Sequence, residues 1–285
     1  MNSLDWPRVQ WIIDRMFEED LGQGDITTAS VATTDRPASA RIVSKDHGVV
    51  AGLAIAKKVF ETRDARLEIV LECADGETVA PGDDLLKIFG SARAILEAER
   101  TALNLLGRLS GIATQTRRFV ENVSGTKAVL LDTRKTGPLI RELDKYAVRA
   151  GGAQNHRTGL YDMVLIKENH VRYAGSIAAA LQNVHNSPDV KNSKVEIEVR
   201  NLNELRQAMA IQIDRIMLDN FSLQDMRRAV EEVGGAVALE ASGGVTLETV
   251  RAIAETGVDF ISVGALTHSV KNFDMSLLFA VDSEA

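Results

Sequence analysis

The sequence predicts an α/β fold, with a barrel-like (β/α) domain in the C-terminal part of the chain and a smaller α+β domain before it. After about residue 127, buried strand-like runs alternate with amphipathic helices, which is typical of a parallel sheet with right-handed crossovers. Each run ends in a polar residue or glycine, as in barrels whose sites lie at the carboxyl ends of the strands. Before residue 90, Asp/Gly turn signals separate the runs, which indicates the smaller domain.

The composition of the chain is that of a folded globular protein. Of its 285 residues 45% are hydrophobic and 26% charged, and the net charge of −7 argues against a nucleic-acid-binding protein. Cys73 is the only cysteine, so no disulfide forms within the chain, as in proteins of a reducing compartment. The longest apolar run, 48–56, is too short to cross a bilayer, and the N-terminus lacks a signal-peptide core. We therefore expect a cytoplasmic protein that does not bind membranes.

The first hundred residues predict the smaller domain. Its β-type runs are 40–43, 67–71 and 85–88. A long helix follows from Ser91 to Leu109, because apolar residues recur at spacings of three and four. We expect this α+β sandwich-like domain to cover residues 1–112, completed by the C-terminal segment 269–285, and the barrel-like domain to cover residues 113–268.

The rest of the chain predicts six strands, with helices between them. The strands are 128–131, 163–166, 195–199, 215–218, 237–241 and 260–263. Pro138 suits a first helical position, and Ser222 with Asp225 resembles a capping box. A row of basic residues at spacing four is predicted to be a solvated helix face; it consists of Arg141, Lys145 and Arg149.

The residues at the strand ends are those that could carry chemistry. In chain order they are Asp132 with Arg134 and Lys135, Lys167, Glu198, Asp219, Ser242 with Gly243 and Gly244, and Gly264. Because the carboxyl ends of barrel strands meet at one face, we expect these residues to form one site. At the last two ends, 242–245 and 263–265, glycines let backbone N–H groups approach an anion, which predicts a phosphate cradle.

Two charged groups complete the predicted site. Segment 132–172 carries eight Lys or Arg against five Asp or Glu, and its residues at strand ends or after the Gly151-Gly152 break predict a receptor for a polyanion. These residues are Arg134, Lys135, His156, Arg157 and Lys167. Glu198 and Asp219 suit Mg²⁺ or sugar hydroxyls. Glu196 shares a strand face with Glu198, and for it we expect an ion pair with Arg200 or Arg215.

Ten short motifs stand in order along nearly the whole chain. They are 20–28, 98–104, 110–114, 132–136, 145–148, 155–157, 165–170, 218–220, 240–244 and 267–269. Together they resemble the quinolinate phosphoribosyltransferases, also called nicotinate-nucleotide pyrophosphorylases (carboxylating). The sequence departs from this family at Gly137-Pro138-Leu139, where the family usually has Thr-Pro-Gly, and at Ala153, where it usually has a third glycine.

The resemblance implies an activity and a role for each site residue. The enzyme would convert quinolinate and 5-phosphoribosyl 1-diphosphate, with Mg²⁺, into nicotinate mononucleotide, diphosphate and CO₂ in de novo NAD biosynthesis. The acid would contact Arg100, Thr133, Arg134, His156, Arg157 and Lys167; the diphosphate Lys135 and His268; the ribose and Mg²⁺ Glu198 and Asp219; and the 5-phosphate Ser242, Gly243, Gly244, Gly264 and Ala265. Lys135, Glu198 and Asp219 would be the catalytic residues. A homodimer or higher even oligomer would share its sites, with Arg100 reaching into the partner.

Other functions remain open at this point. A molybdenum-associated paralogue or another phosphoribosyltransferase would keep the phosphate cradle but lose part of the acid-binding set. A barrel aldolase would use Lys167 to form a Schiff base with a carbonyl substrate. A non-catalytic nucleotide-binding regulator would bind phosphoribosyl diphosphate without turnover.

Overall fold

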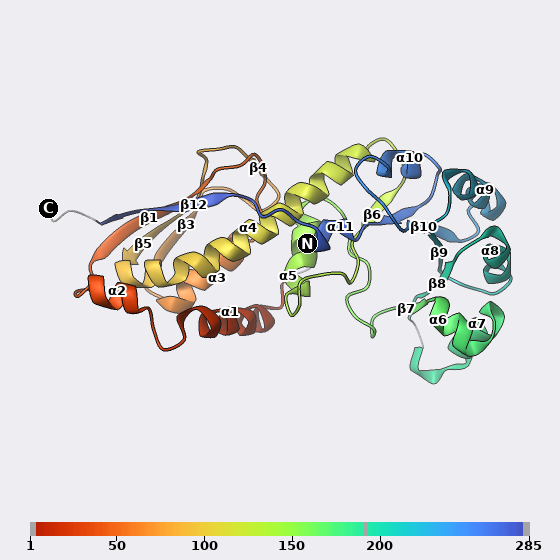
Figure 1. Ribbon diagram of the computed structural model, residues 1–285, viewed down its shortest axis with the longest axis horizontal. Helices are drawn as coiled ribbons and strands as arrows, with labels where there is room; N and C mark the ends of the chain where they lie inside the picture. The colour runs from red at the N-terminus through yellow and green to blue at the C-terminus, as the bar shows by residue number, and fades with distance from the viewer. Residues whose placement is uncertain (1–3, 191–192, 282–285) are drawn as a thin grey trace. The chain divides into compact units, whose positions relative to one another are not determined.

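The computed structural model describes residues 4–190 and 193–281, which divide into two compact units (Figure 1). The first unit combines the described residues up to Arg117 with 137–152 and the chain from Val270 onward, and the second comprises 118–136 and 153–269. Segment 137–152 thus groups with the first unit, whereas the sequence places it in the barrel-like domain. Residues 1–3 and 282–285 of the predicted smaller domain lie outside the described residues.

The first unit is built on a four-stranded antiparallel sheet. Its strands, in spatial order, are β12 (Met275–Val281), β1 (Pro37–Ser44), β5 (Asp84–Ser91) and β3 (Glu68–Leu71). Its other elements are α1 (Trp6–Leu21), α2 (Ile26–Val31), α3 (Leu53–Arg63), α5 (Arg141–Ala150) and a short pair, β2 (Gly48–Val49) with β4 (Thr78–Val79). Apolar side chains from β1, β5 and α3, such as Ile42, Leu86 and Phe60, are fully buried and form the core.

Helix α4 (Ala92–Asn122) is longer than the predicted 91–109 helix. Its apolar spacing continues through the buried Ile112 and Phe119. Gly111 lies inside the helix and does not end it. A Cβ at this position would lie 2.3 Å from the carbonyl oxygen of Lys271. Glycine inside this helix therefore lets a distant segment of the same unit approach closely.

Helix α5 corrects two expectations from the sequence. Pro138 does not begin it, because Leu139 adopts φ 64° and the helix starts only at Arg141. Lys145 is buried rather than solvated, since α5 is buried on most sides and its Asp144 pairs with Arg108 at 2.7 Å. A spacing of four in charged residues therefore does not identify a solvated face.

The second unit contains a six-stranded parallel sheet, as predicted. Its strands in spatial order are β6 (Val129–Leu131), β11 (Phe260–Ser262), β10 (Ala238–Ser242), β9 (Arg215–Asp219), β8 (Val195–Val199) and β7 (Val164–Ile166). Every strand lies within one residue of its predicted bounds. β8 is buried on both faces, with Ile197 and Val199 inaccessible to solvent, as expected for a parallel strand.

The order of these strands distinguishes the fold from a doubly wound sheet. β7 to β11 follow the chain order, and β6, the first strand of the unit, pairs with β11, the last. In a doubly wound sheet the first strand lies in the middle. Within residues 4–190 and 193–281, β6 and β7 are not paired with each other, and the open edge of β6 instead forms a bridge between Leu131 and Gln154.

Helices connect the strands of the second unit (Figure 1). They are α6 (Glu168–Ala174), α7 (Ile177–Asn186), the 3-10 turn η1 (Pro188–Val190), α8 (Leu202–Met209), α9 (Leu223–Val233), α10 (Val250–Ala254) and α11 (Ala265–His268). The Ser222 hydroxyl accepts the backbone N–H of Asp225 at 3.1 Å, so the predicted cap of α9 is present. In the described part of the chain, no helix combines the length and apolarity needed to cross a membrane.

Candidate active site

The carboxyl ends of the six parallel strands surround a cavity of about 860 Å³. It brings together fourteen of the residues predicted from the sequence: Thr133, Arg134, Lys135, His156, Arg157, Lys167, Glu198, Asp219, Ser242, Gly243, Gly244, Gly264, Ala265 and His268. Parallel strands place their carboxyl ends at one edge, so residues up to 135 positions apart in sequence meet there. Arg100 is the exception: it lies exposed on α4 in the first unit, whereas the cavity belongs to the second.

Besides His268, five basic side chains line the cavity. Arg134 and Lys135 follow β6, His156 and Arg157 follow the Gly151-Gly152 break, and Lys167 ends β7. Burial and the nearby charge of Arg134 lower the pKa of Arg157, which shows how closely the cations gather. An anion with several negative charges would relieve this repulsion, so the lining favours a polyanionic ligand.

His156 is tied to a buried charged network inside the sheet. Its Nε2 lies 3.1 Å from Glu196 and 3.5 Å from Glu240, and Glu240 also pairs with Arg215 at 2.7 Å. The side chains of both glutamates are almost inaccessible to solvent. The expected partner of Glu196 was Arg200 or Arg215; the structure gives His156 instead, because Arg215 is taken by Glu240.

The protonation of His156 follows from its contacts. Burial lowers the pKa of this histidine, but hydrogen bonds to Glu196 and Glu240 outweigh burial and raise it to about 9. Its Nδ1 accepts the backbone N–H of Arg157 at 2.7 Å, which opposes a proton on that nitrogen. Nε2 therefore carries a proton in both the neutral and the charged ring, and this proton faces the carboxylates. The group resembles a metal-ligand set, yet Arg215 and His156 already compensate its two carboxylates.

A second pair of carboxylates lies at the mouth of the cavity. Glu198 pairs with Lys167 at 2.7 Å, and Asp219 accepts a hydrogen bond from the side chain of Asn220 at 3.0 Å. Burial and the charge of Glu198 raise the pKa of Asp219. The two carboxylates lie on adjacent strands and repel each other. A hard cation such as Mg²⁺ would bind their oxygens and relieve this repulsion.

The glycine turns after β10 and β11 form another part of the wall. Gly243 has φ 97°, and a Cβ there would lie 2.2 Å from Oδ1 of Asn220, so no other residue fits. A Cβ at Gly264 would lie 3.1 Å from the His268 ring and 3.2 Å from Lys135. α10 begins only at Val250, later than the sequence suggests. Both turns line the cavity together with His268 and Lys135.

Five lining residues were not predicted as site residues from the sequence. They are Leu165, Met217, Asn220, Thr246 and Ser262. Asn220 had a detectable signal: it follows the strand-end Asp219, and asparagine is enriched at positive φ, here 54°. The apolar residues carry no such signal, because inward-facing strand positions resemble any core position.

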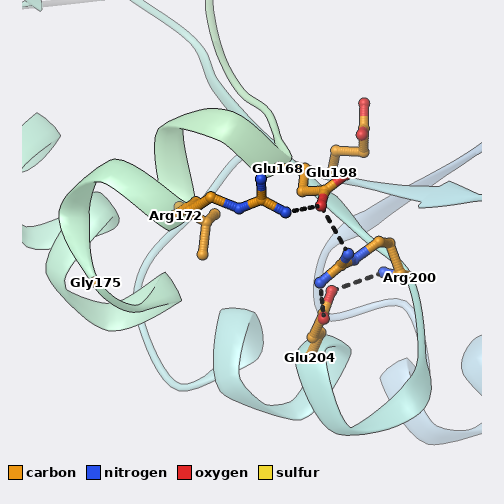
Figure 2. A pocket seen from close by; sticks show the side chains of 7 residues that line it. Glu168, Arg172, Gly175, Glu198, Arg200 and Glu204 are labelled. Carbon is orange, nitrogen blue, oxygen red and sulfur yellow. Dashed lines mark hydrogen bonds and ion pairs between the residues drawn. The ribbon is translucent and has the colours of Figure 1, made fainter.

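A smaller hollow of about 260 Å³ lies on the other side of Glu198 (Figure 2). In Figure 2 a chain of ion pairs runs from Arg172 to Glu168 (3.1 Å), on to Arg200 (3.0 Å) and then to Glu204 (3.1 Å). These charged side chains are engaged with one another. The larger cavity is therefore the better candidate for substrate.

Comparisons with known proteins agree with this arrangement. Residues 25–110 match the family model of the quinolinate phosphoribosyl transferase N-terminal domain, and residues 112–278 that of the C-terminal domain. A probable nicotinate-nucleotide pyrophosphorylase [carboxylating] of Bacillus subtilis is 40% identical, over 100% of this chain and 97% of that protein. The chloroplastic nicotinate-nucleotide pyrophosphorylase [carboxylating] of Arabidopsis thaliana is 41% identical over 96% of this chain and 82% of its own. A nicotinate-nucleotide pyrophosphorylase structure from Francisella tularensis superimposes with a TM-score of 0.93 at 42% identity, covering 98% of both chains.

Proposed function

Since the chain belongs to the quinolinate phosphoribosyl transferase family, we propose that it is a carboxylating nicotinate-nucleotide pyrophosphorylase. It joins quinolinate to 5-phosphoribosyl 1-diphosphate and yields nicotinate mononucleotide, diphosphate and CO₂, a step of NAD biosynthesis. The observation that carries the proposal is the single cavity in which five cations and two glycine turns meet.

The cations at one end of the cavity receive the acid. Quinolinate carries two carboxylates on one ring, and planar guanidinium groups such as those of Arg134 and Arg157 bind carboxylates with paired hydrogen bonds. Lys167 and His156 add charge to the same region, although Nε2 of His156 faces the buried glutamates. The glycine turns with Ser242 receive the 5-phosphate, and Lys135 and His268 receive the diphosphate.

Glu198 and Asp219 bind the ribose hydroxyls and would hold Mg²⁺, which neutralises the diphosphate when it is bound. The ring nitrogen displaces diphosphate at the anomeric carbon through an oxocarbenium-like state. Positioning of the two reactants and stabilisation of the departing charge by Lys135 account for most of the catalysis. As CO₂ leaves, the electron pair of the breaking C–C bond stays on the ring carbon, stabilised by the quaternised nitrogen, and a proton from solvent on that carbon completes nicotinate mononucleotide.

The direct test incubates the purified protein with quinolinate, 5-phosphoribosyl 1-diphosphate and Mg²⁺ and follows nicotinate mononucleotide by chromatography. We expect turnover with quinolinate and a much lower kcat/KM with nicotinate, whose single carboxylate leaves one of the clustered cations without an anionic partner. Equal efficiency with both acids would contradict the dicarboxylate assignment. Binding of phosphoribosyl diphosphate without turnover would favour a regulator instead.

The metal assignment has its own test. Glu198→Gln and Asp219→Asn should raise the KM for 5-phosphoribosyl 1-diphosphate and the Mg²⁺ concentration required, because each removes one negative oxygen donor. Calorimetry should show quinolinate binding alone largely unchanged in both variants. Loss of quinolinate binding with an unchanged Mg²⁺ requirement would reverse the two assignments.

The functional molecule in this proposal is a homodimer, or a higher even oligomer, in which Arg100 completes the partner's site. Arg100 is exposed and makes no hydrogen bond or ion pair with any residue that the structure describes. Leu103, on the same helix, is already buried within the chain, so the proposal depends on the exposed Arg100 itself. In an isologous interface the same arginine would reach into the partner from both chains.

A further inference from the structure

Two residues of the motifs at 132–136 and 155–157 have no part in the substrate contacts proposed above. Asp132 directly follows β6 and is completely buried. Asn155 directly precedes His156 and Arg157 and is half-buried. A buried carboxylate is costly unless hydrogen bonds compensate it, so the contacts of Asp132 indicate its purpose.

The Asp132 carboxylate connects the end of β6 to the segment that carries His156 and Arg157. Its Oδ1 accepts the backbone N–H of His156 at 2.8 Å, and its Oδ2 accepts the side-chain N–H of Asn155 at 2.7 Å. Backbone hydrogen bonds extend this connection: Gln154 donates to Leu130 at 3.0 Å, and Asp132 donates to Gln154 at 3.2 Å. All four contacts lie at the edge of β6 opposite β11, where no other strand that the structure describes pairs with it.

On each side of this connection, cations that line the cavity follow within three residues along the chain. Arg134 and Lys135 come two and three residues after Asp132, and His156 and Arg157 come immediately after Asn155. These cations repel one another, and the segment 154–157 pairs its backbone with this edge of the described sheet through the bridge between Leu131 and Gln154. The spacing between the two pairs of cations therefore depends on the Asp132 contacts.

We propose that Asp132 and Asn155 are positioning residues that fix the distance between Arg134, which follows Asp132, and Arg157, which follows Asn155, so that both guanidinium groups meet one dianion. The inference deepens the proposed function, because the dianion in question is quinolinate. Neither residue touches the substrate; each acts through the cations that follow it.

The donor and acceptor pattern allows a sharp test. In Asp132→Asn, the amide oxygen can still accept from His156, but the new NH₂ group faces the NH₂ group of Asn155 unless the Asn155 amide rotates to offer its oxygen. The variant therefore loses the charged acceptor and changes the orientation of Asn155. In Asn155→Asp, two carboxylates meet. In the double variant Asp132→Asn/Asn155→Asp, the new amide at position 132 donates to the new carboxylate at position 155. The oxygen of the same amide still accepts the backbone N–H of His156. The net charge is that of the parent protein.

The experiment measures kcat, both KM values, quinolinate binding by calorimetry and the melting temperature. Each single variant should raise the KM and Kd for quinolinate by about tenfold or more, the effect of a lost hydrogen bond to a charged group, with a smaller change for 5-phosphoribosyl 1-diphosphate. The double variant should recover most of the lost affinity. A double variant as weak as the two losses combined, or single variants with normal quinolinate affinity, would overturn the proposal.

Asp259→Asn is the matched control. Asp259 also accepts one backbone N–H, from Leu239 at 2.8 Å, and one side-chain N–H, from Lys127 at 2.7 Å, but at the amino end of β11. It should lower the melting temperature without changing the KM for quinolinate. If the single variants at 132 and 155 do not fold, Asn155→Ala leaves the His156 contact intact and should still weaken quinolinate binding; unchanged binding would refute the proposal.

The outcomes also separate this inference from the proposed function. If the parent protein makes no nicotinate mononucleotide, the function fails. Calorimetric titration with quinolinate or with phthalate, a dianion of similar shape, still tests the positioning role in that case. Binding of the dianion that falls in the single variants and returns in the double variant would support the inference alone.

Discussion

At the scale of single residues, the core of the second unit is unusual because it holds charges. His156, Glu196, Glu240 and Arg215 sit among strands whose other inward positions are aliphatic or small, and together they balance two acids against two bases. Such a network adds little to stability as a whole, but removal of one member leaves an uncompensated charge.

Glu240→Leu should therefore destabilise the protein strongly. The variant removes the carboxylate that pairs with Arg215 at 2.7 Å and leaves His156 with one neighbouring carboxylate, that of Glu196, instead of two. We expect the free energy of unfolding to fall by about 3 to 5 kcal/mol, the usual result of breaking a buried pair from one side, as measured by urea denaturation.

The control for this prediction is Glu232→Gln. Glu232 also pairs with an arginine, Arg206, at 2.5 Å, but the pair lies on the surface. We expect a much smaller loss than for Glu240→Leu, since solvent screens exposed pairs. A Glu240→Leu variant no less stable than this control would mean that the buried charges are not coupled.

At the scale of elements, the loop before α5 holds a residue whose backbone conformation is unfavourable for a residue with a side chain. Leu139 adopts φ 64°, a left-handed conformation that costs a non-glycine residue about 1 to 2 kcal/mol. It stands where the quinolinate phosphoribosyltransferases usually have glycine, and its side chain is 67% exposed, so little packing repays the cost. The helix start moves to Arg141 for the same reason.

Leu139→Gly should stabilise the protein despite the greater flexibility that glycine gives the unfolded chain. We expect a gain of up to about 1 kcal/mol in the free energy of unfolding, measured by chemical denaturation. Leu160→Gly is the counterpart, because Leu160 is similarly exposed (73%) but has no positive φ. That variant should lose stability. If both leucine variants lose stability equally, the strain at Leu139 is negligible.

At the scale of the whole molecule, a shared site in a dimer predicts complementation. Arg100→Ala and Lys135→Ala homodimers should each be nearly inactive, because every site in them lacks one contact. Heterodimers formed by joint refolding should regain one intact site, since both substitutions then fall in the other site. The measurement is specific activity against the heterodimer fraction found by native mass spectrometry. Heterodimers without recovered activity would place the role of Arg100 within its own chain.

Much of the second unit could be predicted because its signals are local. A buried parallel strand is a short apolar run, and a helix start needs a capping side chain within three residues, so the six strands and the Ser222 cap were found almost to the residue. The convergence of Glu198, Asp219 and Gly243 also followed, because parallel strands with helical crossovers place their carboxyl ends together whatever the residues between them.

The sequence by itself determined the class of fold, the strands and most residues of the cavity, since each depends on spacing along the chain. Only the tertiary structure decided which groups face one another: that His156 meets Glu196 and Glu240, that Asp132 holds Asn155, and that Lys145 is buried. These contacts join residues far apart in sequence or depend on what packs against a helix. Hydrogen-bond partners are set by distances of tenths of an ångström between distant segments, and no periodicity along the chain records them.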